Sequence, residues 1–222
     1  MSTDNPAQPP RREQAGATRE LLLRTAERLY AELGLAQVSN RQIVDAAGQA
    51  NNSALTYHVG TRADLIRAIT RSHTDPIACH TWRMAEETRG STDPRDHVAA
   101  LVLPYTRHLA DLGTPSWFAR YGPQISTDPA LADNARADLI RVPQFQEGLA
   151  AVWAHVTDIP AREVALREQA MRLTVIHTCA EQERTAAETG TPADWTLVGE
   201  ALVDAVTGLL LAPRRAQVAN ST

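Results

Sequence analysis

Residues 38–65 read V-S-N-R-Q-I-V-D-A-A-G-Q-A-N-N-S-A-L-T-Y-H-V-G-T-R-A-D-L, and this stretch indicates the fold of the chain. Its pattern predicts a short helix over residues 40–47, a turn at Gly48 and a second short helix over about residues 51–58. Ser39 precedes the first helix, where a serine side chain can cap free backbone N–H groups. Two short helices joined by a Gly-containing turn are typical of the helix-turn-helix unit, whose second helix enters a DNA major groove.

The second short helix is mostly polar. Its clearly apolar residues are Ala54, Leu55 and Val59, so we expect one edge to dock and the rest to face outward. Hydrogen-bonding side chains on such a face suit base edges and phosphates. We therefore expect contacts near base edges from Asn51, Asn52, Ser53 and Thr56. The alternative for Asn52 and Ser53 is that they only cap the short helix.

Helices are also expected on both sides of this stretch. A helix over about residues 18–33 is predicted by apolar residues that recur on one face, namely Leu22, Ala26, Leu29, Tyr30 and Leu33. Thr61 and Asp64 fit a capping box at the start of a further helix, which should run to about Arg89 and bend or break at Pro76. Residues 1–16 show no periodicity and are expected to form a flexible arm.

Residues 17–70 resemble the N-terminal domain of TetR-type transcriptional regulators, and cover about a quarter of the chain. The resemblance is carried by the runs A-x-x-L-Y-A-E-L-G, S-N-R-Q-I-V-D-A-A-G and Y-H-V-G-T-R-A-D-L-I. The usual family form of the last run is Y-H-F-G-S-K-E-x-L, so Val59, Thr61 and Arg62 depart from it conservatively. The turn and second helix are one residue longer than in many members, which resembles a subgroup reading N-x-S-A-[LV]-x-Y-H-F-G.

This resemblance adds a second set of DNA contacts. Partly by matching family positions, we expect phosphate contacts from Ser39, Arg41, Tyr57, His58 and Arg62. The alternative for Tyr57 is packing in the core of the DNA-binding domain, and the alternative for Arg62 is an unbound, solvated side chain.

The distribution of charge is compatible with a DNA-contacting domain at one end. The chain has a net charge of −4, all its basic residues are Arg, and residues 11–72 hold nine of these Arg against six acidic residues. A basic N-terminal third on an acidic remainder suits a small DNA-binding domain attached to a body with another role.

The remaining sequence reads as helix after helix, so the predicted fold class is all-α. Helix starts are indicated at Asp93–Pro94, Gly113–Pro115, Asp128–Pro129, Pro160 and Thr191–Asp194.

The last two helices carry apolar stripes at near-heptad spacing. These stripes consist of Leu166, Ala170, Leu173, His177 and Ala180, then Trp195, Val198, Leu202, Ala205 and Leu209. Two such hairpins paired across a twofold axis make a four-helix bundle, so a homodimer is expected. The alternative is that the stripes face only the core of their own chain. The resemblance favours the dimer, because TetR-type regulators typically dimerise through their last two long helices.

Aromatic residues and two histidines of the body form the candidate ligand pocket. The set is Trp82, Tyr105, His108, Trp117, Phe118, Tyr121, Phe145, Trp153 and His177. Ordinary core packing is the alternative for each of them. The sequence does not indicate the chemistry of the ligand.

Several functional classes lack sequence support. No phosphate loop, catalytic motif or spaced metal-ligand set is present, so we expect neither an enzyme, a cofactor nor a metal. Cys79 and Cys179 are isolated and predict two reduced, mostly buried thiols. No apolar run is long enough to cross a membrane and no leader is visible, so we expect a cytoplasmic protein without membrane partners.

The sequence thus predicts four segments: a flexible arm over 1–16, a helix-turn-helix DNA-binding domain over 17–75, a helical effector-binding and dimerisation domain over 76–212, and a flexible tail over 213–222. We expect a dimeric transcriptional regulator that is released from a palindromic DNA operator by an unidentified small-molecule effector. The alternatives are an activator or co-repressor-dependent regulator, and a helical protein–protein adaptor whose DNA-binding domain is degenerate.

Overall fold

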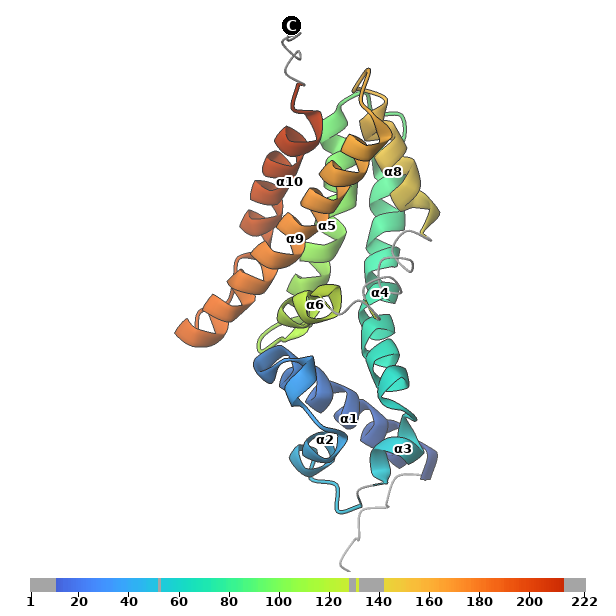
Figure 1. Cartoon of the computed structure of the whole chain (residues 1–222), viewed down its shortest axis with the longest axis vertical. Coiled ribbons are helices and arrows are strands. Elements are labelled where there is room, and N and C mark those ends of the chain that lie inside the picture. Colours follow the sequence, from blue (N-terminus) through green and yellow to red (C-terminus); the bar gives the residue numbers. More distant parts are fainter. Residues whose placement is uncertain (1–10, 52, 128–130, 132–141, 214–222) are drawn as a thin grey trace, which may run out of the picture. The chain divides into compact units, whose positions relative to one another are not determined.

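The computed structural model describes residues 11–51, 53–127, 131 and 142–213. Regular structure in these ranges is helical and includes no strand, which confirms the predicted all-α fold (Figure 1). The chain divides into two compact units, residues 1–72 and 73–222, called the head and the body below. None of the described helices is both long and apolar enough to cross a membrane. The helix start predicted at 128–129, most of the arm and the end of the tail lie outside the described residues.

The head contains four α-helical segments and one short 3-10 helix. In chain order these are α1 (Arg11–Leu33), η1 (Leu35–Gln37), α2 (Asn40–Ala46), α3 (Ala54–His58) and the first part of α4 (Arg62–Glu87). Their core is built from one face of each helix and includes side chains that are at most 1% exposed, among them Leu22, Tyr30, Ile43, Leu55 and Ile69. Because α3 has only five residues, this burial, rather than its own hydrogen bonds, must hold it in place.

Three details of the head differ from the sequence-based expectation. Helix α1 begins at Arg11, so residues 11–16 are not part of a flexible arm. The negative charge of Glu13 in the first turn interacts favourably with the helix dipole and stabilises this end. The Thr18 hydroxyl donates a hydrogen bond to the Gln14 carbonyl at 2.9 Å. Leu33 is 47% exposed and does not belong to the core. Helix α3 begins at Ala54 rather than near residue 51, because the Asn51 side chain accepts the backbone N–H of Ser53 at 2.9 Å and holds a separate turn.

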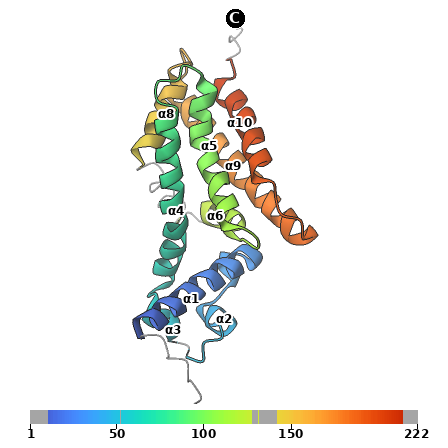
Figure 2. The ribbon, with the colours of Figure 1, turned by 180° about the vertical axis from the view of Figure 1, so that it is seen from behind.

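The body contains the rest of α4 and five further described helices. These are α5 (Pro94–Leu112), α6 (Phe118–Thr127), α8 (Pro143–Trp153), α9 (Ala161–Thr189) and α10 (Trp195–Leu211). Helix α5 packs against α10 on one side and α8 on the other, while α9 packs against α6 and α10, as both views of the ribbon show (Figures 1 and 2). The starts predicted at Asp93–Pro94 and Asp194 are confirmed, since each aspartate caps its helix. Pro76 and Pro104 lie inside continuous helices, so α4 is not interrupted at Pro76.

A close approach of α5 and α10 depends on Gly199. A Cβ atom at this position would lie 2.7 Å from Thr106 Oγ1 and 2.8 Å from Leu103 Cδ2. The same pair of helices is joined at the surface by Arg95, which bonds Glu200 at 3.0 Å and Asp204 at 2.9 Å. Backbone proximity and ion pairing thus fix the register of α10 on α5.

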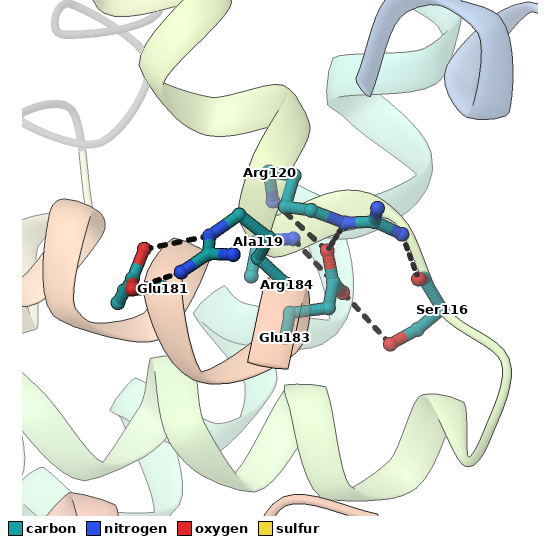
Figure 3. A network of polar contacts seen from close by, with 6 residues as sticks. All are labelled: Ser116, Ala119, Arg120, Glu181, Glu183 and Arg184. Carbon is teal, nitrogen blue, oxygen red and sulfur yellow. Dashed lines mark hydrogen bonds and ion pairs between the residues drawn. The ribbon is translucent and has the colours of Figure 1, made fainter. Parts of the chain in front are cut away.

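Glu183 of α9 anchors the first turn of α6 (Figure 3). Its carboxylate is 3% exposed and accepts the Ser116 hydroxyl at 2.7 Å, the Ala119 N–H at 3.3 Å and the Arg120 N–H at 2.9 Å. The Arg120 guanidinium also donates to it at 3.2 Å. One buried negative charge therefore satisfies free N–H groups at a helix N-terminus and pairs with a cation.

We predict that Glu183→Gln lowers the free energy of unfolding by about 2–4 kcal/mol, because Arg120 would keep its charge in a poorly hydrated place without a counter-ion. Glu181→Gln is the matched control on the same helix. Glu181 is exposed and pairs with the surface residue Arg184, so its loss should cost below about 1 kcal/mol. Chemical denaturation of both variants measures the difference, and equal losses would contradict the role assigned to Glu183.

Candidate functional site

The first helix of the helix-turn-helix unit is fixed by a reciprocal cap. The Ser39 hydroxyl accepts the Gln42 N–H at 3.3 Å, while Gln42 Oε1 accepts the Ser39 N–H at 2.8 Å. The predicted cap at Ser39 is confirmed. Gln42 was missing from the predicted set, although the spacing S-x-x-Q is a recognised capping box and was sufficient to find it.

The polar residues of α3 and of the turn before it face outward. Tyr57 is 83% exposed, which excludes the alternative that it packs in the head core. Asn51, Ser53 and Thr56 are also exposed, and His58 is half-buried with its ring edge against Tyr57. Ala54 and Leu55 form the buried edge that docks α3. Asn52 lies outside the described residues.

Arg41 extends this outward face onto α2. Its side chain is 78% exposed and is engaged only loosely with Asp45, at 3.7 Å. The exposed side chains of Arg41, Asn51, Ser53, Thr56 and Tyr57 are called the polar face below. The head core does not need them, so they are available for a partner.

Arg62 differs from the prediction that it holds a phosphate. Its guanidinium donates to the backbone carbonyls of Leu35 and Val38, the latter at 2.6 Å, and lies 5.1 Å from the centre of the Tyr30 ring. Burial raises the pKa of Tyr30, an effect that the charge of Arg62 partly offsets. Arg62 therefore holds the segment before α2 against α1, and its donors point into the head. Sequence could not reveal this, because the carbonyls lie more than 20 positions upstream.

The body brings four of the predicted pocket residues together. The rings of Tyr105, His108 and Tyr121 lie 5.8, 5.5 and 6.4 Å from that of Phe118, measured between centroids. His73, which was not predicted, stacks on Phe118 at 3.8 Å, and its Nδ1 lies 2.8 Å from His108 Nε2. These five residues, His73, Tyr105, His108, Phe118 and Tyr121, are called the aromatic cluster. It joins α4, α5 and α6.

The other predicted pocket residues have separate surroundings. Trp82 is 53% exposed and His177 is exposed. Trp153 donates to Glu168 at 2.8 Å, Phe145 is buried on α8, and Trp117 is half-buried. Residue type alone could not separate these residues from the cluster, since every body helix carries an aromatic residue or a histidine.

Two residues of the aromatic cluster, His108 and Tyr105, have pKa values that keep them uncharged near neutral pH. The pKa of His108 is lowered to about 4, and burial is the largest cause. Electrostatic interaction with His73 and His80 lowers it further, whereas the charge of Asp111 raises it. Burial also raises the pKa of Tyr105 well above its usual value and that of the neighbouring Cys179 thiol to about 12. Cys179 is buried as expected, whereas Cys79 is exposed on α4 and contradicts the expectation of two buried thiols.

The two stripes predicted for a dimer interface have different surroundings in a single chain. Leu166, His177 and Ala205 are exposed, whereas Leu202 is 3% exposed and lies in the core of its own chain. The remaining stripe positions are intermediate in exposure, namely Ala170, Leu173, Ala180, Trp195, Val198 and Leu209. Leu197, 65% exposed, lies on the outer face of α10 and was missed, because a heptad count does not show which face the chain itself buries.

No family model matches this sequence, and no curated protein matches it either. Among solved structures, the crystal structure of the TetR family transcriptional regulator PfmR from Thermus thermophilus aligns with a TM-score of 0.56. The alignment covers 89% of this chain and 97% of that chain, with 16% sequence identity. The chain therefore has the fold of a TetR family regulator, which supports the resemblance seen in residues 17–70 at the level of fold.

We predict that Arg62→Ala destabilises the head by about 2–3 kcal/mol, because two charge-assisted hydrogen bonds to buried carbonyls are lost. Arg67→Ala is the control, since Arg67 is 63% exposed and pairs only with Asp64 one turn away. Its loss should cost below about 1 kcal/mol. Hydrogen exchange of head amides reports the local stability. Equal protection in the two variants would contradict the inward role of Arg62.

We also predict that His108 makes the body sensitive to acid. Its pKa is depressed in the folded chain, so the unfolded chain binds the proton more readily below its ordinary pKa of 6.5. The stabilisation should be complete above that pH and decrease toward pH 4, by up to about 3 kcal/mol. Urea unfolding across this range should show the slope in the native chain and in the control His155→Phe, an exposed site, but not in His108→Phe. A slope that persists in His108→Phe would assign it to another group.

Proposed function

We propose that this protein is a ligand-responsive, DNA-binding transcriptional regulator of the TetR type, a repressor that leaves a palindromic operator when a small molecule binds. The observation that carries the proposal is the polar face. Its hydrogen-bonding side chains project from a helix-turn-helix unit whose core is complete without them, and only Asn51 among them also holds the turn before α3. Ser53, Thr56 and Asn51 would lie near base edges, and Arg41 and Tyr57 near phosphates.

Two copies of the head would be needed to read such an operator. We place the dimer contact on the outer faces of α9 and α10, where Leu166, Leu197 and Ala205 are exposed apolar residues. A twofold dimer would present two recognition helices to successive major grooves, roughly 34 Å apart. The printed description of PfmR as a transcriptional regulator supports the same function. The proposed compartment is the cytoplasm, where the DNA of a bacterial-type regulator lies.

Ligand response would act through α4. This helix carries Leu65 and Ile69 of the head core and His73 of the aromatic cluster within one continuous segment. A molecule that binds the body would favour one arrangement of α4, and it would change DNA affinity only by its differential affinity for the two states.

We predict that Arg41→Ala weakens binding to the intergenic DNA beside the gene by about tenfold, because a phosphate contact is lost. The slope of the logarithm of the binding constant against the logarithm of the salt concentration should fall by about one. Arg28→Ala is the matched control. Arg28 is also an arginine of the head with an acidic partner four residues on, at 3.4 Å, so both changes remove the same charge. Gel-shift titrations at several salt concentrations measure both quantities.

Equal losses in Arg41→Ala and Arg28→Ala would show that only net charge matters, and would contradict the polar face as the DNA-contacting surface. Native protein that shows no sequence preference among DNA fragments would favour the adaptor alternative. Reporter expression in a strain lacking the gene gives the sign of regulation: the proposed repressor predicts a rise.

A further inference from the structure

Two buried polar atoms of the aromatic cluster have no hydrogen-bond partner among the described residues. They are the phenolic oxygen of Tyr105 and Nδ1 of His108. His108 is 3% exposed, and its other ring nitrogen is engaged with His73. A buried polar group without a partner costs about 1–3 kcal/mol, so native proteins keep few of them and each calls for an explanation.

The two atoms belong to one place in the body. Tyr105 and His108 are three residues apart on α5 and therefore lie on the same face of that helix. Both rings border Phe118. Gly122 of α6 lies beside the phenolic oxygen of Tyr105, since a Cβ atom at Gly122 would lie 3.5 Å from that oxygen. The residues that carry the two unpartnered atoms thus border the same aromatic ring.

The carboxylates near the two atoms already have partners. Glu183 is one of them, and its two oxygens are occupied by Ser116, the first turn of α6 and the Arg120 guanidinium (Figure 3). Asp111 is the other, and it is exposed and lies 2.9 Å from His80. Cys179 is a buried thiol held in its protonated form, and His108 is held neutral. An ionic ligand would lose its hydration here without meeting an unpartnered opposite charge among these groups, which disfavours both carboxylates and amines.

The hydrogen-bonding capacity of the two atoms limits which ligand groups can bind them. A phenolic hydroxyl donates and accepts, whereas Nδ1 of a neutral imidazole does one or the other, depending on which nitrogen carries the proton toward His73. A ligand hydroxyl matches either arrangement, and a carbonyl matches the donor forms. Aromatic rings around the atoms favour a flat aromatic ligand by edge and stacking contacts.

We propose that the aromatic cluster binds an uncharged, largely apolar aromatic molecule through a hydroxyl or carbonyl oxygen that hydrogen-bonds to Tyr105 and His108. The inference names the ligand class for the regulator, and in that sense it rests on the proposed function. It requires neither the DNA contact nor the direction of regulation, because it concerns only groups of the body.

The test compares three probes of one ring system by calorimetry on the full chain at about pH 7.5, where naphthol is neutral. We expect 2-naphthol to bind more tightly than naphthalene, and 2-naphthoate not to bind. Tyr105→Phe should weaken 2-naphthol binding by about 3- to 10-fold, the value of one hydrogen bond, and leave naphthalene binding unchanged. Without ligand, the same variant should unfold at an unchanged or higher temperature, because the hydroxyl it removes has no partner within the described chain.

Four outcomes would overturn the assignment. These are no 2-naphthol binding at about 1 mM, equal binding of the anion, undiminished binding to Tyr105→Phe, and a lower unfolding temperature of Tyr105→Phe. The last would show that bound water alone satisfies the hydroxyl. Since the calorimetry contains no DNA, a failure of operator binding would not affect the assignment of the ligand class. Conversely, 2-naphthol that binds as expected without changing DNA affinity would contradict ligand-controlled release and leave the ligand class standing.

Discussion

The carboxylate of Glu183 joins α9 to the beginning of α6 in a place that water hardly reaches. Removing a charge from water is costly, and it is tolerated here because four donors from one short segment converge on two oxygens. This anchor fixes Phe118, the first residue of α6. Phe118 in turn is the ring against which His73, Tyr105 and His108 are arranged. The anchor at Glu183 therefore helps to position the ring around which the aromatic cluster is arranged.

The head is stabilised by different contacts. It is held by one apolar face per helix, and by the inward-turned Arg62, which closes the segment between α1 and α2. This arrangement concentrates the stabilising contacts on one side of α2 and α3. The opposite side can then carry Thr56 and Tyr57, which have no structural role in the head, beside Asn51, which also holds the turn before α3.

Sequence revealed what depends on neighbours within a few residues. The capping residues Ser39, Asp93 and Asp194 were evident because each cap and its helix are adjacent in the chain. The partners of Arg62, Glu183 and His73 were not evident, since they lie 24 to 67 positions away and no periodic pattern connects them. The stripe on α10 failed at Leu202 for a related reason. Helix α10 has one apolar face that packs against its own chain and exposed apolar residues on the other side. The two sets overlap in sequence, and their spacing does not show which set is buried.

The contrasting surroundings of the two cysteines have a practical consequence. Cys179 is sealed in the body with its thiol protonated, while Cys79 is exposed on α4, six residues beyond His73. Thiol reagents act on the accessible thiolate, so a maleimide dye or spin label will attach at one position in the native chain. The protein thus has a natural single-site reporter on the helix shared by its two units, and a label there can follow that helix without any engineered cysteine.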